Sequence, residues 1–77
     1  RVYGMAGMNH SIHQYEANGI TLYTVIYKDQ DGEHDMSAQN PCESIADLLD
    51  FIGELHKEGF ITAAERNALL ADCEGLR

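Results

Sequence analysis

The chain has 77 residues, which is near the lower end of what folds alone, so we expect one small domain. Five Lys and Arg against thirteen Asp and Glu give a formal net charge of −8, which disfavours binding to nucleic acid or an anionic membrane surface because phosphates would be repelled. The ordinary apolar fraction of 44% argues against disorder, and no apolar run approaches the roughly 18 residues of a membrane span.

The first residues carry little structural signal. The chain does not begin with Met, and Met5 and Met8 are both candidate natural starts, so the residues before them are native or introduced by cloning. We therefore expect residues 1–9 to be a flexible segment and residues 10–77 to form a single small α+β domain.

A β-hairpin is predicted around Asn18-Gly19, because this dipeptide tolerates the positive φ angles of a type I′ turn and separates two strand-like runs. The turn sets three cross-strand pairs, namely Ala17 with Ile20, Tyr15 with Leu22 and His13 with Thr24. A second turn signal at residues 29–32 lets residues 33–37 return as a short, charged edge strand.

Two helices follow the strands. For the first, over residues 41–58, we expect Asn40 as N-cap and Glu43 to close a capping box, with Gly59 ending the helix. A second capping box, Thr62 with Glu65, starts the second helix. The apolar residues of the two helices recur at helical spacing: Ile45, Leu48, Leu49, Ile52 and Leu55, then Ala68, Leu69, Leu70 and Cys73. Phe60 and Ile61 in the connection are expected to fold back onto the helices.

The predicted fold is therefore α+β, a small antiparallel two- or three-stranded sheet followed by an antiparallel helical hairpin, in the order ββ(β)αα. The helices can cover only one face of the sheet, yet residues 20–27 are apolar on both faces. Ile20, Leu22 and Ile26 point one way and Tyr23, Val25 and Tyr27 the other. A second copy of the chain is the simplest cover for the remaining face, and the N-terminal segment is the other candidate. We expect a homodimer, with Tyr23, Val25 and Tyr27 forming the self-association face.

Residues 46–73 resemble the SHOCT (short C-terminal) domain, a short helical hairpin. The similarity lies in leucines at helical spacing, then a Gly, an Ile-Thr pair and a Glu three residues later: Leu48, Leu55, Gly59, Ile61, Thr62 and Glu65. The chain departs from that family at Arg66, where an aromatic residue is usual, and at Cys73 and Glu74, where leucines are usual. The resemblance implies an interaction or oligomerisation hairpin without catalytic residues.

Acidic residues form a line along the first predicted helix. Glu43, Asp47, Asp50, Glu54 and Glu58 are spaced three or four residues apart, with no Lys or Arg inside the line. Like charges one turn apart repel by roughly 0.2–0.5 kcal/mol per pair. A solvated helix face is the simple interpretation. The functional interpretation is a surface for a basic partner, because carboxylates about 5–6 Å apart along the helix resemble successive phosphates of a nucleic-acid strand.

The other chemically active residues show no known site pattern. His10, His13, His34 and His56 do not have metal-ligand spacing with the cysteines, and residues 29–35 lack the calcium-loop pattern. Cys42 and Cys73 are too few for a disulfide scaffold and predict reduced thiols in the cytoplasm. No nucleophile motif, phosphate-binding Gly loop or acid/base pair is visible, so we expect neither an enzyme nor a cofactor or small-molecule substrate.

The sequence thus favours an intracellular protein–protein interaction module. One form of it is a small, phage-like inhibitor or accessory factor that mimics DNA and presents the acidic helix to a basic, nucleic-acid-binding protein. One alternative is a nucleic-acid-binding regulator, because a strand followed by two helices resembles ribbon-helix-helix proteins, although the acids lie on the helix that would approach phosphates. The other alternative is a small metal-binding protein.

Overall fold

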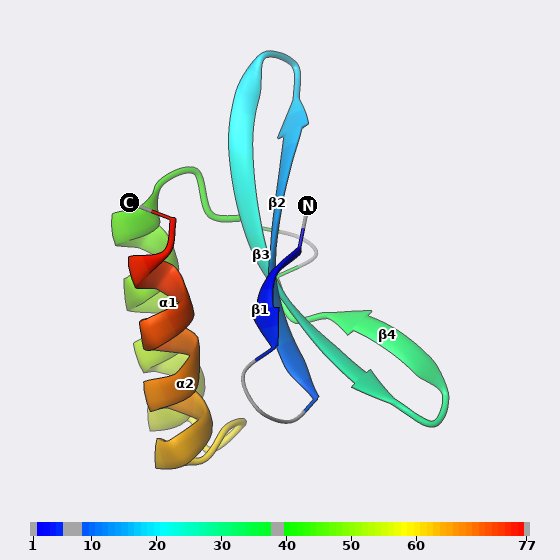
Figure 1. The fold of residues 1–77 in the computed structure, drawn as a ribbon, viewed down its shortest axis with the longest axis vertical. Helices are drawn as coiled ribbons and strands as arrows, with labels where there is room; N and C mark the ends of the chain where they lie inside the picture. Colours follow the sequence, from blue (N-terminus) through cyan, green and yellow to red (C-terminus); the bar gives the residue numbers. More distant parts are fainter. Residues whose placement is uncertain (1, 6–8, 38–39, 77) are drawn as a thin grey trace.

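The computed structural model describes residues 2–5, 9–37 and 40–76, with side chains from residue 9 onward. It confirms the α+β fold, in which antiparallel strands precede two helices (Figure 1). The elements are β1 (Val2–Met5), β2 (His10–Ala17), β3 (Ile20–Asp29), β4 (Gly32–Asp35), α1 (Ile45–Lys57) and α2 (Ala63–Glu74). The strands form one sheet in the order β1-β2-β3-β4, so each strand pairs with its neighbour in the chain.

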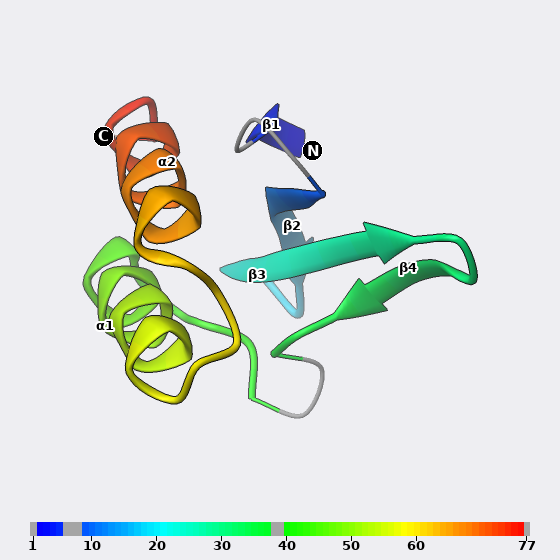
Figure 2. The ribbon, with the colours of Figure 1, turned by 90° about the horizontal axis from the view of Figure 1, so that it is seen from below.

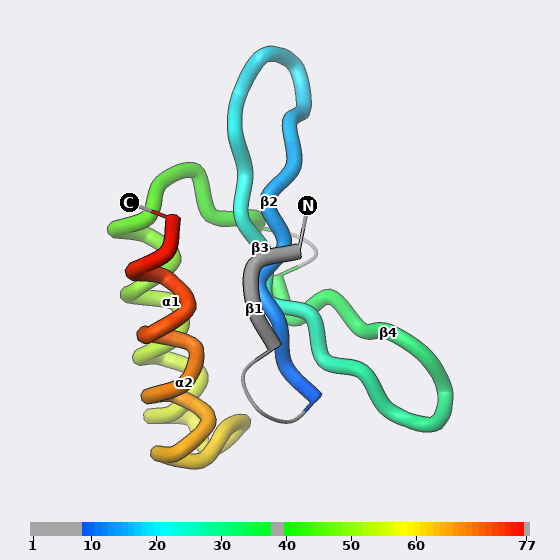
Figure 3. Tube along the Cα trace, in the orientation of Figure 1, coloured from blue at the N-terminus to red at the C-terminus, as the bar shows by residue number. Residues whose placement is uncertain are grey.

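The β2–β3 hairpin has the predicted turn and register. Asn18 and Gly19 have φ angles of 55° and 78°, the positive values that a type I′ turn needs. The pairing runs without a break from Ala17 opposite Ile20 to His10 opposite Tyr27, and includes the three predicted pairs. The tip of this hairpin extends beyond the helices, and the β3–β4 turn projects in another direction (Figures 1 and 3).

Two strands flank this hairpin, and only one of them was expected. β4 is the short charged edge strand, and the Asp29 carboxylate accepts a hydrogen bond of 2.8 Å from the backbone N–H of Asp31 in the preceding turn. On the other edge, Val2–Met5 forms β1 and pairs with β2, with Val2 opposite His13. Val2–Met5 therefore belongs to the sheet, which corrects the expectation that these residues are part of a flexible segment before the domain. Unpaired backbone groups on the β2 edge make an added strand favourable.

The start of α1 differs from the prediction. Ser44 is the N-cap, and its hydroxyl accepts a hydrogen bond of 3.1 Å from the backbone N–H of Asp47. Cys42 forms an antiparallel bridge with Tyr23, through backbone hydrogen bonds of 2.8 and 2.9 Å. Because this bridge uses both backbone groups of Cys42, the helix cannot begin until the chain has passed it. Asn40 is therefore not the cap, and Glu43 lies before the helix rather than in a capping box.

The connection between the helices follows the sequence closely. Gly59 has a φ angle of 84°, and the backbone N–H of Phe60 donates to the carbonyl of Leu55 at 2.9 Å, which closes the last turn of α1. The predicted Thr62–Glu65 capping box is present in full. Ile61 folds back and is buried as predicted, whereas the side chain of Phe60 is 66% exposed.

Both helices pack on one side of the sheet, α1 against β3 and α2 against β1 and β2 (Figure 2). The core between the layers contains Ile12 and Val25 from the sheet, Cys42 and Ile61 from the connections, and Leu48, Ile52, Leu55, Leu69 and Cys73 from the helices. Burying each large aliphatic side chain stabilises the fold by about 1.5–3 kcal/mol. The predicted helical faces supply most of these residues. No helix in the described parts of the chain is long and apolar enough to cross a membrane.

The helices cover the face of β3 that the sequence analysis assigned to self-association. Val25 is fully buried in the core, and Tyr23 packs against that core. Val25 is therefore not available for self-association, and Tyr23, Val25 and Tyr27 do not together form the exposed face that was expected, because the helices pack on this side of the sheet. The face turned away from the helices carries the alternate residues, including Tyr15 and Ile20, which are 40% and 47% exposed. Both faces of β3 are apolar, so the residue pattern alone could not identify the covered one.

Candidate functional site

The predicted acidic line is present along α1, with one member displaced. Asp47, Asp50 and Glu54 lie on the helix and Glu58 is its C-cap, and all four side chains are exposed. We call these four residues the acidic face. Glu43 is also exposed, but it precedes the N-cap and does not continue the helical line. The prediction of a single rod over residues 41–58 is therefore corrected to Ile45–Lys57.

The acidic face has no neutralising partner within the described residues. The ion pairs of that part of the chain both use histidine, with His10 next to Glu65 and His34 next to Asp29. Lys57 lies in the last turn of α1 but makes no ion pair with the acidic face. The helix dipole favours Asp47 in the first turn and opposes Glu54 and Glu58 near the C-terminal end. The line therefore raises the free energy of the folded chain unless a positive group approaches from outside.

A second cluster, which the sequence analysis did not predict, lies where the sheet meets the start of α2. His10 Nδ1 lies 3.2 Å from Oε2 of Glu65, without hydrogen-bond geometry, and the His10 side chain is only 3% exposed. The His10 ring contacts Tyr27 at a centroid distance of 5.0 Å, and Tyr27 stacks on His34 at 6.2 Å. His34 Nε2 lies 3.0 Å from Oδ1 of Asp29. Two histidine–carboxylate pairs thus flank one tyrosine ring.

The two carboxylates of this cluster are held in the ionised form. The backbone N–H of Thr62 donates to Glu65 at 2.8 Å and lowers the pKa of Glu65 below its ordinary value. The hydrogen bond with His34 is the largest cause that lowers the pKa of Asp29. Both groups therefore carry negative charge at neutral pH.

A hollow of about 340 Å³ opens beside this cluster. It is lined by His10, Tyr27, Met36, Phe60 and Glu65, which come from the sheet, the segment after β4, the helix connection and α2. We call it the Phe60 hollow. Its walls combine the rings of Tyr27 and Phe60, a thioether and the His10 imidazole with one carboxylate, and the aromatic rings and the carboxylate suit a partly apolar ligand with a positive charge.

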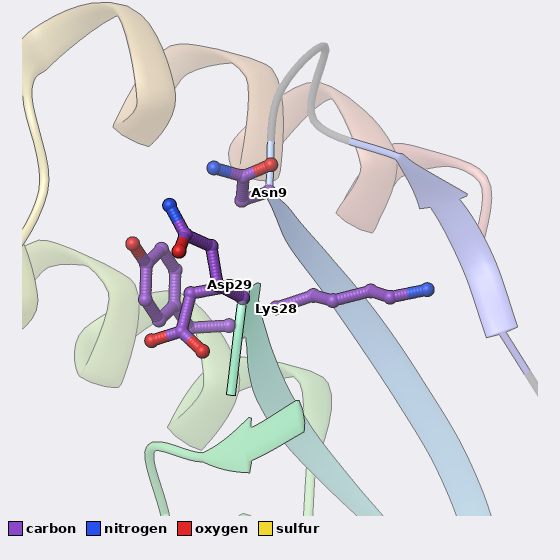
Figure 4. Close-up of a pocket in the computed structure, with 5 residues that line it drawn as sticks. Asn9, Lys28 and Asp29 are labelled. Carbon is purple, nitrogen blue, oxygen red and sulfur yellow. The ribbon is translucent and has the colours of Figure 1, made fainter. Parts of the chain in front are cut away.

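A second hollow, of about 490 Å³, lies at the end of β3 and shares Tyr27 with the first. Its other lining residues are Asn9, Lys28, Asp29 and Gln30. The backbone N–H of Lys28 donates to the carbonyl of Asn9 at 2.8 Å, which holds the two segments together. Figure 4 shows the Lys28 and Asp29 side chains pointing in opposite directions, as expected for successive residues of a strand. The lysine therefore does not neutralise the aspartate beside it.

The cysteines and histidines do not form a reactive site in the described structure. Cys42 and Cys73 are both buried, and burial raises the pKa of Cys42 to about 11, which makes it a poor nucleophile at neutral pH. No group of three or more His, Cys, Asp or Glu side chains is close enough to hold a metal ion among the residues whose placement is described.

Part of the second cluster could have been found from the sequence. The register of the Asn18-Gly19 hairpin, continued to its end, places His10 opposite Tyr27. The approach of Glu65 could not be found in this way, because it depends on how α2 packs against β2. For Phe60 the sequence predicted burial and not exposure, because a hydrophobic residue after a helix-ending glycine commonly folds back onto the helix.

Comparison with known proteins identifies no relative. The chain matches no protein-family model, no curated protein and no solved structure. The resemblance of residues 46–73 to the SHOCT hairpin therefore stays a prediction.

Proposed function

We propose that this protein is a non-enzymatic, intracellular protein–protein interaction module that presents the acidic face of α1 to a basic partner protein. The observation that carries the proposal is a row of four exposed carboxylates, Asp47, Asp50, Glu54 and Glu58, without an ion-pair partner in the described residues. Two cysteines are too few for a disulfide scaffold, which fits a reducing compartment such as the cytoplasm.

Electrostatics favour a basic protein over other partners. Each pair of like charges one turn apart destabilises the helix by roughly 0.2–0.5 kcal/mol. A row of Lys or Arg on the partner would attract these carboxylates and offset the repulsion between them. The net charge of −8 repels nucleic acid itself but speeds association with proteins that bind it. A small inhibitor or accessory factor that occupies a phosphate-binding groove, as a DNA mimic does, fits this charge pattern.

An exposed aromatic residue in the connection that follows α1 strengthens the proposal. Phe60 follows the C-cap Glu58 by two residues, and its side chain is 66% exposed. Protein interfaces commonly combine a central aromatic anchor with charged residues around it. The acidic face and Phe60 together provide both parts.

The test reverses the charge of three residues of the acidic face and compares this variant with one in which three acids elsewhere are reversed. We expect the Asp47→Lys, Asp50→Lys, Glu54→Lys variant to lose its partner in affinity capture from native lysate, followed by mass spectrometry. The matched control reverses three exposed acids of the sheet and its turns, Glu16→Lys, Asp31→Lys and Glu33→Lys, and has the same net charge. The control should retain capture, because its charge change lies away from α1.

Equal loss of capture in both triple variants would show that total charge, and not the acidic face, governs binding. Unchanged capture by the α1 variant would show that the acidic face is only solvated. Thermal unfolding checks that each variant is folded, and we expect the α1 variant to be at least as stable as the wild type because it removes like-charge repulsion.

Self-association is a second candidate property, and the open face of the sheet favours it. Tyr15, Ala17, Ile20 and Leu22 share this face on β2 and β3, and none of them is charged. On a chain with a net charge of −8, an uncharged apolar face is where a second copy meets the least repulsion. We therefore propose a homodimer that pairs these faces, in place of the Tyr23, Val25 and Tyr27 face.

Analytical ultracentrifugation tests the dimer. We expect the wild type to sediment as a dimer at micromolar concentration and Ile20→Asp to sediment as a monomer. Thr21→Asp introduces the same charge one residue later, on the opposite face of β3, and should remain dimeric. A monomeric wild type, or equal behaviour of the two variants, contradicts this interface.

A further inference from the structure

We infer that the Phe60 hollow is the binding site for one cationic side chain, lysine or arginine, of the basic partner. This inference rests on the proposed function and names the contact that anchors the partner beside the acidic face. The hollow is close to the lower limit of about 300 Å³ for ligand pockets, so it suits a single side chain better than a larger ligand.

The aromatic walls of the hollow are available for such a contact. The backbone of Phe60 is fixed by the positive φ angle of Gly59 and by the hydrogen bond to Leu55, while its side chain remains exposed. Tyr27, on the sheet, provides the second ring. A cation close to the faces of aromatic rings is attracted by their quadrupoles, and the alkyl stem of lysine or arginine packs against the same surface. Met36 adds a polarizable thioether wall.

The charge of the hollow favours a cation. Glu65 Oε1 accepts a hydrogen bond from Thr62, and its Oε2 faces His10, so the carboxylate is fixed in position. An ionised carboxylate has about four acceptor sites, which leaves room for a further donor. The lining residues include no Lys or Arg, and Lys28 lies in the neighbouring hollow. The only described lining residue that can carry a positive charge is His10, which already faces Glu65 Oε2, so a partner's ammonium or guanidinium group would add a second positive group at this carboxylate.

An apolar side chain is the competing occupant, and neutral analogues separate the two. The probes are N-acetyl-lysine methylamide, N-acetyl-arginine methylamide and the uncharged N-acetyl-norleucine methylamide, titrated into the full chain and followed by NMR. We expect the two cationic probes to shift the Tyr27 and Phe60 ring signals with saturation. The norleucine analogue should bind about tenfold more weakly, because it has the alkyl stem without the charge.

Two variants locate the binding groups. Phe60→Ala changes an exposed side chain and should weaken binding of the cationic probes roughly 2–5-fold. Glu65→Gln keeps a side chain that can complete the capping box but removes the charge, and it should weaken binding at least as much. Glu74→Gln is the matched control, because it removes an exposed acid of the same helix that neither lines the hollow nor belongs to the acidic face, and it should leave the affinity unchanged.

The inference is overturned if norleucine binds as well as lysine, since the hollow is then an apolar pocket. It is also overturned if no probe gives saturable shifts, or if Glu74→Gln and Glu65→Gln weaken binding equally. The Asp47→Lys, Asp50→Lys, Glu54→Lys variant should still bind the small probes. Partner capture that survives this triple reversal, together with intact probe binding, would contradict the proposed function of α1 and leave the hollow as the binding site.

Discussion

The two faces of the β2–β3 hairpin consist of alternate residues of the same two strands, yet they have different surroundings. On the covered face Ile12 and Val25 lie opposite each other and are fully buried beneath the helices. On the open face Tyr15 and Ile20 are 40% and 47% exposed, although Ile20 has the same apolar side chain as Ile12. The difference shows that hydrophobicity makes a residue suitable for a core, while the path of the chain decides whether it enters one.

The face that the helices cover depends on the course of the chain at Cys42. Its backbone bridge to Tyr23 attaches the segment before α1 to the sheet and directs both helices to one side. Thr24 is an exception to the exposure of the open face. The register places it on that face, but its side chain is only 2% exposed. Ser11, on the same face, is also buried and is 6% exposed. The open face is therefore exposed mainly towards the hairpin tip.

The largest expected effect comes from truncating an isoleucine on each face. Ile12→Ala should reduce the free energy of unfolding by about 2–5 kcal/mol, because it leaves a cavity in the packed core. Ile20→Ala should change it by no more than about 0.5 kcal/mol, measured on the monomer by urea unfolding followed by circular dichroism. Similar losses for the two variants would contradict the assignment of the faces.

A smaller loss of stability is expected from removing the N-cap of α2, the helix that packs against β2. Thr62→Ala removes the N-cap of α2 and should cost about 1 kcal/mol of stability. Thr21→Ala is the matched control, because Thr21 is near the hairpin tip and caps no helix. Thermal unfolding should show a lower Tm only for the first variant, and a comparable decrease in the control would contradict the role of the cap.

The same cap predicts a dependence on acid. The pKa of Glu65 is lower in the folded chain, chiefly because Thr62 donates to it, so its contribution is present above the unfolded pKa and is lost as the pH falls through the folded pKa. Wild type and Glu65→Gln should therefore differ in stability near neutral pH and converge under acid. A difference between them that does not change with pH would contradict this linkage.

The smallest effect near neutral pH concerns the thiol beneath the covered face. Burial raises the pKa of Cys42 from 9.0 to about 11, so the thiol destabilises the fold only as the pH rises above 9, where the unfolded state ionises first. At neutral pH native Cys42 should react with iodoacetamide far more slowly than a cysteine placed on the open face by Ile20→Cys. Mass spectrometry of the modified peptides measures both rates, and equal rates would contradict the burial of Cys42.

Much of the fold could be predicted because its signals are local. The Asn18-Gly19 turn fixed the register of β2 and β3, since positive φ angles at those two residues determine which amides face each other. The Thr62–Glu65 box and Gly59 likewise placed the connection between the helices. Three of the four residues of the acidic face followed from helical spacing alone, and Glu58 continued the line as the C-cap.

Tertiary structure decided the features that depend on contacts between distant segments. The bridge between Cys42 and Tyr23 moved the start of α1 to Ser44, and pairing with β2 made a strand of Val2–Met5. Packing of α2 brought Glu65 to His10 and opened the Phe60 hollow. A sequence with two apolar strand faces is compatible with helices on either side, and only the chain path and the packing it permits select one of them.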